Sequence, residues 1–219
     1  MVDTAFALFD FDDTLARGDS ILPYLMYCIR RGKAPKTQLL RAACGYVRWL
    51  LNPASASGAK KSTLTFIKGM KQDDMDELAR DFFRESQSRR FFQDGLKELW
   101  RLRGEGYRIL VVSASAEVYM RVLPEFLPVD AVLCTACPVD ADGCYTGEVG
   151  DNCKGDEKPR RIEAYLKTQQ LRLDKSRSCA YGDSPSDAPM LLLTDAPRLI
   201  NPKKKLAEKL PQAVRLSWK

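Results

Sequence analysis

The feature that most limits the possible folds is a regular alternation of helix and strand patterns over the second half of the chain. Apolar runs without polar interruption alternate there with amphipathic segments. Runs of this kind are typical of strands buried on both faces of a parallel sheet. We therefore expect a doubly wound, Rossmann-like α/β fold. The expected helices are 92–103, 116–126, 157–170 and 185–193, and the expected strands are 107–113, 129–135, 177–182 and 198–200.

A different pattern fills residues 18–88, which follow the first expected strand. No strand-like alternation occurs there, and glycine and proline separate segments with helical spacing. We expect an α-helical bundle inserted as a cap into a core made of residues 1–17 and 89–219. The expected cap helices are 21–31, 36–51, 60–70 and 73–86.

The composition excludes several kinds of chemistry. The 219 residues include no histidine, which excludes Ser-His-Asp and Cys-His hydrolysis and histidine-ligated metals. The net charge of +6 favours anionic ligands at encounter. The basic residues are dispersed and lack interleaved aromatic residues, so we do not expect nucleic-acid binding. No apolar run is long enough to cross a bilayer, so we expect a cytoplasmic protein without stable membrane insertion.

Four of the seven cysteines lie in one region, and the CxxC spacing at its start raises the possibility of a zinc site. Without histidine a mixed site is impossible, and Cys134 closes an apolar run, so small buried or edge thiols are the preferred interpretation. An odd total also argues against complete disulfide pairing and favours a reducing compartment. The four residues are Cys134, Cys137, Cys144 and Cys153.

Carboxylates follow directly after the first apolar run, Ala5–Leu8, in the sequence F-D-F-D-D-T. In an extended chain Asp10 and Asp12 project to the same side, where their charges repel each other. A cation, a shared proton or a basic neighbour relieves such repulsion, and all three are characteristic of active sites. The structural alternative for this segment alone is a helix N-cap.

Three later segments carry polar residues at expected strand ends or helix starts. Ser113 ends an apolar strand run, two lysines stand near the start of the helix at 157, and Asp183 and Asp187 lie in G-D-S-P-S-D. In this order the motifs resemble those of the haloacid dehalogenase superfamily, and they span residues 10–187. The small helical cap is similar to that of the phosphoserine phosphatase-like subfamily.

This resemblance implies a phosphatase with an aspartyl-phosphate intermediate. Asp10 would be the nucleophile, and Mg²⁺ would be bound by Asp10, the backbone carbonyl of Asp12 and the side chain of Asp183. Asp187 would orient a metal-bound water, and Asp12 would act as general acid and base. Ser113 and a lysine would bind the phosphoryl oxygens. A carboxylate is also the natural acid–base candidate in a chain without histidine.

Two lysines compete for the phosphate-binding role. Lys158 is preferred because an apolar stripe at Ile162 and Tyr165 places it in the first turn of a helix. Lys154, in the preceding loop, is the alternative.

The substrate is less well defined, although the resemblance implies a small phosphomonoester. Phosphoserine phosphatases of this kind carry a cap Glu and a cap Arg for the amino acid. By offset, the Glu position falls on Asp19 and the Arg position near Phe66, with only Lys68 close by. The phosphoserine motif is thus incomplete, since no planar carboxylate clamp is evident.

Two alternatives stay open. The apolar and basic cap is compatible with a phospholipid-type phosphatase, similar to phosphatidylglycerophosphatase-like members of the subfamily. A non-catalytic, phosphate-binding regulatory module is the second alternative, although no motif residue is missing. A dehalogenase is disfavoured because the second Asp of D-x-D-x-T fits phosphoryl transfer.

Overall fold

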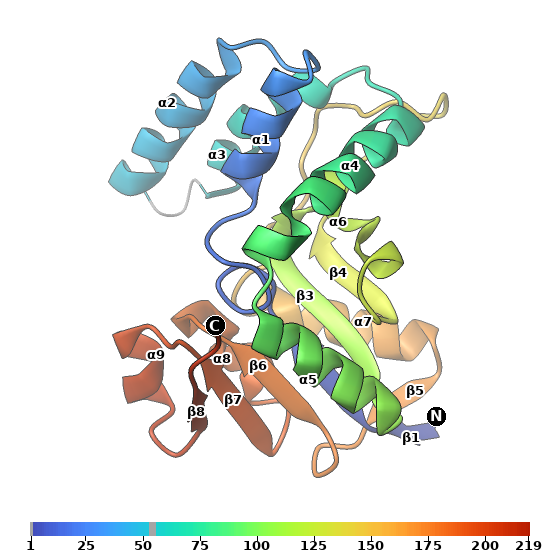
Figure 1. The fold of residues 1–219 in the computed structure, drawn as a ribbon, viewed down its shortest axis with the longest axis vertical. Coiled ribbons are helices and arrows are strands. Elements are labelled where there is room, and N and C mark those ends of the chain that lie inside the picture. The colour runs from blue at the N-terminus through green and yellow to red at the C-terminus, as the bar shows by residue number, and fades with distance from the viewer. Residues whose placement is uncertain (1, 53–55) are drawn as a thin grey trace.

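The computed structural model describes residues 2–52 and 56–219, except for the side chains at positions 49, 56, 57 and 59. Six parallel strands of this part of the chain form one sheet in the order β4-β3-β2-β6-β7-β8 (Figure 1). The expected doubly wound α/β fold is confirmed. The strands are β2 (Phe6–Phe9), β3 (Arg108–Ala116), β4 (Ala131–Thr135), β6 (Cys179–Gly182), β7 (Ala196–Ile200) and β8 (Val214–Leu216).

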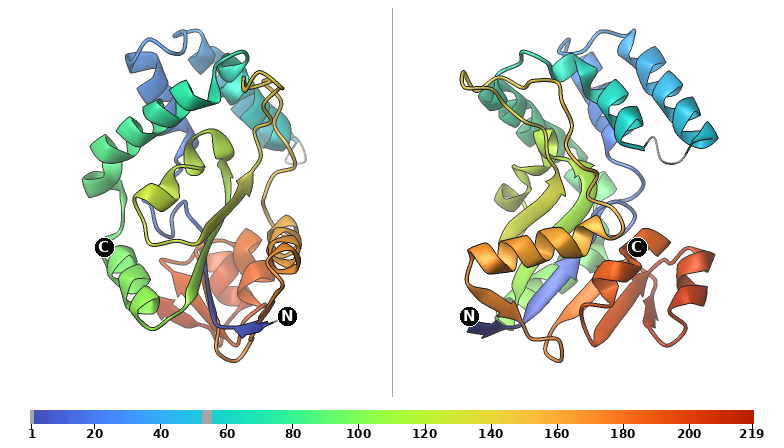
Figure 2. Two further views of the ribbon diagram at one scale, coloured as in Figure 1. Left: turned by 90° about the vertical axis from the view of Figure 1, so that its right-hand side faces the viewer. Right: turned by 180° about the vertical axis from the view of Figure 1, so that it is seen from behind.

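Strand β2 lies at the centre of the sheet and is fully buried on both faces. Phe6 and Leu8 pack with residues of α7, α8 and α9 on one face. Ala7 and Phe9 pack with α5 on the other face, and the left view of Figure 2 shows α5 and α7 on opposite sides of the sheet. The helices are α5 (Gln93–Gly104), α6 (Glu117–Met120), α7 (Glu157–Thr168), α8 (Ala188–Leu191) and α9 (Lys204–Lys209).

Four helices form a separate layer above the carboxyl ends of the central strands (Figures 1 and 2). Tyr24 of this layer contacts Phe82 within it and Tyr119 of the core, with ring centroids 5.3 and 4.7 Å apart. The apolar interior of the layer is therefore continuous with one face of the core. These helices occupy the predicted cap region, whose boundaries at 18 and 88 stay predictions. They are α1 (Ile21–Arg30), α2 (Gln38–Leu51), α3 (Ala56–Leu64) and α4 (Gln72–Arg90).

Prolines divide two of the helices that the sequence pattern predicts. The segment 116–126 contains the short α6 and a 3-10 turn at Leu123–Glu125, because Pro124 has no N–H to bond to a preceding carbonyl. Pro189 has the same effect in 185–193, where a 3-10 turn at Pro185–Asp187 precedes α8. The parallel pair β1 (Val2–Thr4) and β5 (Leu171–Leu173) was not predicted, because neither short strand has a regular buried face.

The seven cysteines are free thiols. Cys134, Cys137 and Cys153 are buried, and Cys144 is half-buried. Burial raises the pKa of Cys153 to about 11, so this thiol is uncharged at neutral pH.

Candidate active site

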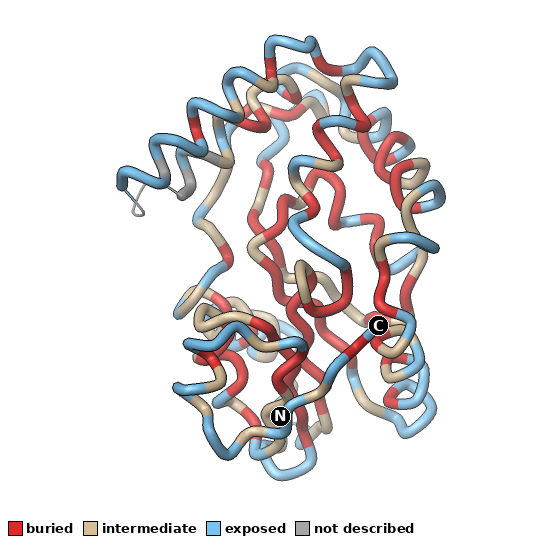
Figure 3. The backbone as a smooth tube through the Cα atoms, turned by 60° about the vertical axis from the view of Figure 1, so that its left-hand side comes forward, coloured by how far each residue is buried: buried red, intermediate tan, exposed pale blue. Residues whose placement is uncertain are grey.

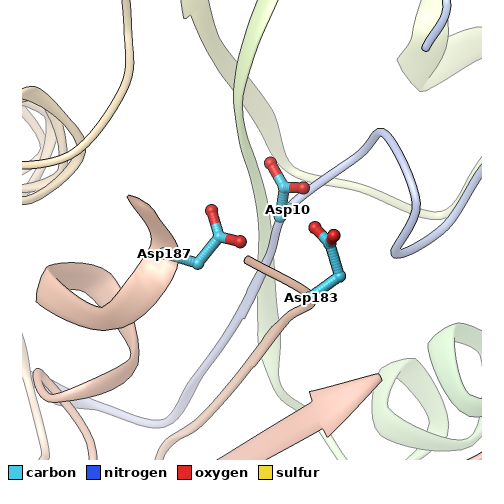
Figure 4. Close-up of side chains that lie close together, drawn as sticks. All are labelled: Asp10, Asp183 and Asp187. Carbon is cyan, nitrogen blue, oxygen red and sulfur yellow. The ribbon is translucent and has the colours of Figure 1, made fainter. Parts of the chain in front are cut away.

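Three buried carboxylates meet where the two central strands end (Figure 4). Asp10 follows β2, and Asp183 follows the neighbouring parallel strand β6, so the sheet itself places the two residues side by side. The 3-10 turn after Asp183 returns Asp187 to the same point. One oxygen from each carboxylate lies within 4.8 Å of the others.

Lys158 neutralises part of this negative charge. It lies in the first turn of α7 and is only 1% exposed, and its Nζ donates to Asp10 Oδ1 at 2.6 Å and to Asp187 Oδ1 at 2.7 Å. Burial alone would lower the pKa of Lys158, but the two carboxylates raise it above its usual range. Of the two lysines considered from the sequence, Lys158 contacts the carboxylates, whereas Lys154 is exposed.

Asp187 is held by the turn that precedes it. Its Oδ2 accepts hydrogen bonds from the backbone N–H and the hydroxyl of Ser184, at 2.9 and 2.8 Å. Burial would raise the pKa of Asp187, but Lys158 and these donors keep it below the ordinary value. The carboxylate also packs against Gly182, where an added Cβ would lie 2.6 Å from the Asp187 Cβ. Glycine is therefore required at the end of β6.

Asp183 forms a second ion pair that the sequence patterns did not predict. Lys203, just beyond β7, places its Nζ 2.7 Å from Asp183 Oδ2. Burial raises the pKa of Asp183 and Lys203 partly opposes this shift. The lysine belongs to a basic run, Lys203–Lys205, whose position after a strand was the available signal.

The three carboxylates form a suitable donor set for a divalent cation. Hard carboxylate oxygens at this mutual distance are the ligands that Mg²⁺ prefers. Burial raises the pKa of Asp10 to about 8, with Lys158 opposing the shift. The excess of buried negative charge would be relieved by a cation at this point. The geometry thus fits the predicted metal, and the ligand roles of individual residues belong to the proposal below.

Asp12 lies outside this cluster and faces the cap. Its Oδ2 accepts a hydrogen bond of 2.6 Å from Ser115, whereas its Oδ1 is buried and accepts none from the described residues. Burial raises the pKa of Asp12 to about 7, and the nearby charge of Asp19 adds to the shift. A chain of hydroxyl groups extends from Ser115 to Tyr119. The Ser115 Oγ lies 3.0 Å from the Ser20 Oγ, which lies 2.9 Å from the Tyr119 hydroxyl oxygen. The sequence patterns missed this hydroxyl chain, since Ser20 lies about 95 residues before the other two members.

Ser113 and Asp19 each have a local hydrogen-bonding role. Ser113 is fully buried in β3, and its Oγ accepts a hydrogen bond of 3.0 Å from the backbone N–H of Ser115. Asp19 Oδ1 accepts a hydrogen bond of 2.9 Å from the Ile21 N–H at the start of α1, and the residue also lines the pocket described next.

A pocket of about 320 Å³ lies between the core and the cap, which is within the range of small-ligand sites. Asp12 and Ser115 belong to its core side, and Ala42 and Tyr46 of α2 to its cap side. Lys154 and Asn152 complete the wall from the loop before α7. Its other lining residues are Asp19, Ile21, Lys60, Thr63, Ala114 and Tyr119.

Lys60 is the cap cation of this pocket. It extends from α3 to the core, where Nζ donates to the Ala114 carbonyl, to Thr135 Oγ1 at 2.9 Å and to Asn152 Oδ1 at 2.5 Å. Burial lowers its pKa to about 8. The sequence offset instead fell near Phe66, with only Lys68 close by, and the aliphatic stem of Lys68 packs against Gly147. Only the folded cap shows which of its many basic residues reaches the pocket.

The fold and the site describe a doubly wound α/β protein with a buried carboxylate centre beneath a helical cap. A family model for haloacid dehalogenase-like hydrolases matches residues 7–192, and the chain belongs to this family.

Two curated relatives cover most of the chain at low identity. The inhibition of morphological differentiation protein of Streptomyces azureus is 25% identical over 91% of this chain and 73% of its own length. Phosphoserine phosphatase SerB1 of Mycobacterium tuberculosis is also 25% identical, over 93% of this chain and 67% of its own length.

Solved structures support the fold. A protein of unknown function from Bordetella pertussis superposes with a TM-score of 0.86 at 21% identity and covers 98% of this chain and 99% of its own. A substrate-bound phosphoserine phosphatase superposes with a TM-score of 0.63 at 18% identity, covering 99% and 94%.

Proposed function

We propose that this hydrolase is a Mg²⁺-dependent phosphomonoesterase that works through an aspartyl phosphate on Asp10. The observation that carries the proposal is the buried cluster of Asp10, Asp183 and Asp187 with Lys158 at the end of the central strands. Phosphoryl transfer needs mainly positioning and neutralisation of charge, which such a cluster supplies. A phosphatase among the curated relatives is consistent with this assignment.

Asp10, Asp183 and the backbone carbonyl of Asp12 would hold the Mg²⁺, with Asp187 orienting its water. The bound ion would neutralise charge on the phosphoryl oxygens and so permit an anionic nucleophile to approach. Asp187 also fixes Lys158 beside Asp10, which keeps the lysine ready to meet a phosphoryl oxygen. Ser113 belongs to the same group of phosphate-binding residues in this proposal.

The chain's own residues account for both half-reactions. In the first, an Asp10 oxygen bonds to phosphorus while the bond to the leaving oxygen breaks, and Asp12 gives that oxygen a proton. In the second, Asp12 takes a proton from water, which attacks phosphorus and breaks the bond to Asp10. The free, buried Oδ1 of Asp12 faces no competing donor among the described residues, which suits this task.

The substrate in this proposal is a small phosphorylated metabolite. Besides Asp12, the pocket offers two cations, Lys60 and Lys154, and the carboxylate of Asp19 to the leaving group. Phosphoserine is compatible with these charges, but the described residues that line the pocket include no arginine for a bidentate clamp. The free thiols agree with a cytoplasmic location, which is part of the same proposal.

The direct test is release of phosphate from para-nitrophenyl phosphate with Mg²⁺ or with EDTA. Asp10→Asn removes the nucleophile, so we expect loss of at least about a thousandfold in kcat with an unchanged circular dichroism spectrum. Asp195→Asn, at an exposed surface pair, is the matched control and keeps full activity. Normal turnover by Asp10→Asn or in EDTA would contradict the mechanism. No turnover on any substrate by folded wild type with Mg²⁺ would favour the regulatory module instead.

A phospholipid-type phosphatase is the second candidate, and one observation favours it. The pocket wall formed by α2 continues into an exposed apolar surface. The substrate panel should therefore compare phosphoserine, sugar phosphates and nucleotides with phosphatidylglycerophosphate. Preference for the last of these by kcat/KM would select this candidate.

A further inference from the structure

The cap region carries an extreme charge imbalance. Between Asp19 and Asp73 the sequence has no acidic residue at all. The remainder of the chain has 25 basic and 29 acidic residues, so its net charge is −4. The net positive charge of the chain thus comes entirely from the segment between Asp19 and Asp73. Its ten basic residues are Arg30, Arg31, Lys33, Lys36, Arg41, Arg48, Lys60, Lys61, Lys68 and Lys71.

Helix α2 within this segment has an apolar outer face. Leu40, Cys44, Val47 and Leu51 recur at helical spacing and are all exposed, Leu40 by 69% and Leu51 by 82%. The opposite side of the helix contains the buried Gln38 and Gly45. An ordinary surface helix has the reverse arrangement, with its apolar stripe against the core.

The surroundings of this outer stripe are cationic. Arg41 and Arg48 each follow a stripe residue by one position and are exposed, so they border the stripe along one side. Figure 1 shows α2 as the outermost helix of the cap, and Figure 3 shows exposed residues along much of this helix. The apolar stripe, bordered by arginines, is therefore not covered by any other part of the chain that the structure describes.

We propose that the outer face of α2 docks on the surface of a bilayer that contains anionic lipid. The stripe would enter the boundary between headgroups and acyl chains, and the arginines would bind lipid phosphates. No described helix has the length and hydropathy to cross a bilayer, so contact would be parallel to the membrane surface. This inference does not depend on the proposed catalytic function.

The charge pattern favours a lipid surface over a second copy of this chain. A symmetric dimer through α2 would bring Arg41, Arg48 and the other cap cations towards their own equivalents, which repel. A bilayer offers apolar depth for the stripe and diffuse negative charge for the whole basic cap. Because Ala42 and Tyr46 of the same helix line the pocket, docking would place the pocket close to the headgroups.

The test is co-sedimentation of the full chain with large unilamellar vesicles, comparing phosphatidylglycerol–phosphatidylcholine mixtures with pure phosphatidylcholine. We expect wild type to bind the anionic vesicles at low salt and to dissociate at high salt. Leu40→Glu/Val47→Glu should weaken this binding by at least about tenfold, because both side chains lose apolar contact. Arg41→Glu/Arg48→Glu should also weaken it by more than about tenfold, since each cation near an anionic surface contributes about fivefold.

The matched control is Leu192→Glu/Val214→Glu, which makes the same change at core positions of similar exposure, 54% and 52%. This control should bind like wild type, and turnover of para-nitrophenyl phosphate should be unchanged in the Leu40/Val47 variant. Absence of vesicle binding by wild type, or equal loss in the control, would overturn the proposal. So would sedimentation velocity showing a wild-type dimer that Leu40→Glu/Val47→Glu dissociates, without vesicle binding.

Discussion

Removal of the Lys158 ammonium group should destabilise the protein, because this group separates two buried carboxylates in the active site. Lys158→Met leaves Asp10 and Asp187 as two buried carboxylates whose nearest oxygens lie within 4.8 Å. Burial raises the pKa of Asp10 to about 8, so both carboxylates are charged only at a higher pH such as 9. With both ionised, their repulsion at that distance is about 3 kcal/mol at an effective dielectric constant of about 20. Removing one partner of a buried ion pair by substitution destabilises proteins by about 3–5 kcal/mol. We therefore expect the variant to lose about 3–5 kcal/mol of the free energy of unfolding.

The assay is urea denaturation at pH 9 in EDTA, followed by tryptophan fluorescence and circular dichroism. Lys154→Met is the matched control, because this lysine is exposed and contacts neither carboxylate, and it should change stability by less than about 0.5 kcal/mol. The double variant Lys158→Met/Asp187→Asn removes one of the two charges. It should recover about 2–3 kcal/mol of the loss, since the two substitutions act on one interaction.

Equal destabilisation by Lys158→Met and Lys154→Met would refute this electrostatic account. Failure of the second substitution to restore stability would do the same, because the loss would then come from packing of the lysine stem rather than from charge.

Two further predictions concern close packing and pH. Gly182→Ala should lower the free energy of unfolding by about 1–3 kcal/mol and reduce kcat, because the new Cβ would lie 2.6 Å from the Asp187 Cβ. Gly104→Ala, where a Cβ meets open space, should change neither stability nor kcat. Lys60, with a pKa lowered to about 8 by burial, is cationic below that pH and neutral above it. KM for an anionic substrate should therefore rise between pH 7 and 9. Lys60→Met should abolish this rise, whereas the control Lys61→Met should retain it. The same rise in Lys60→Met would show that Lys60 is not the cation that binds the substrate.

Much of the core could be predicted from local sequence. The uninterrupted apolar runs at Phe6–Phe9 and in β3 predicted buried parallel strands, because both faces of such strands must be apolar. Acidic residues at their ends then predicted where side chains would gather. Lys158 was favoured over Lys154 from helical periodicity alone, and the structure places Lys158 between the carboxylates.

The parts of the site that could not be predicted depend on contacts between segments that are far apart in the sequence. Ser20, Ser115 and Tyr119 form their hydroxyl chain only after the cap folds onto β3, and no local spacing indicates it. Lys60 is one of ten basic residues between Asp19 and Asp73, and its selection for the pocket depends on the packing of α3. Lys203 reaches Asp183 because two neighbouring strands end together.

The central position of β2 has a consequence for biosynthesis. Within the six-stranded sheet this strand is made before the other five, and its pairing partners are made much later, since Phe6 pairs with Arg108 and Ala7 with Cys179. At about 5–20 residues per second, the ribosome needs about 10–35 s to make the chain between Ala7 and Cys179. The helical cap, with mostly local contacts, emerges during that interval. The carboxylate site, which also needs Asp183, Asp187 and Lys203, is thus among the last parts of the nascent protein to be completed.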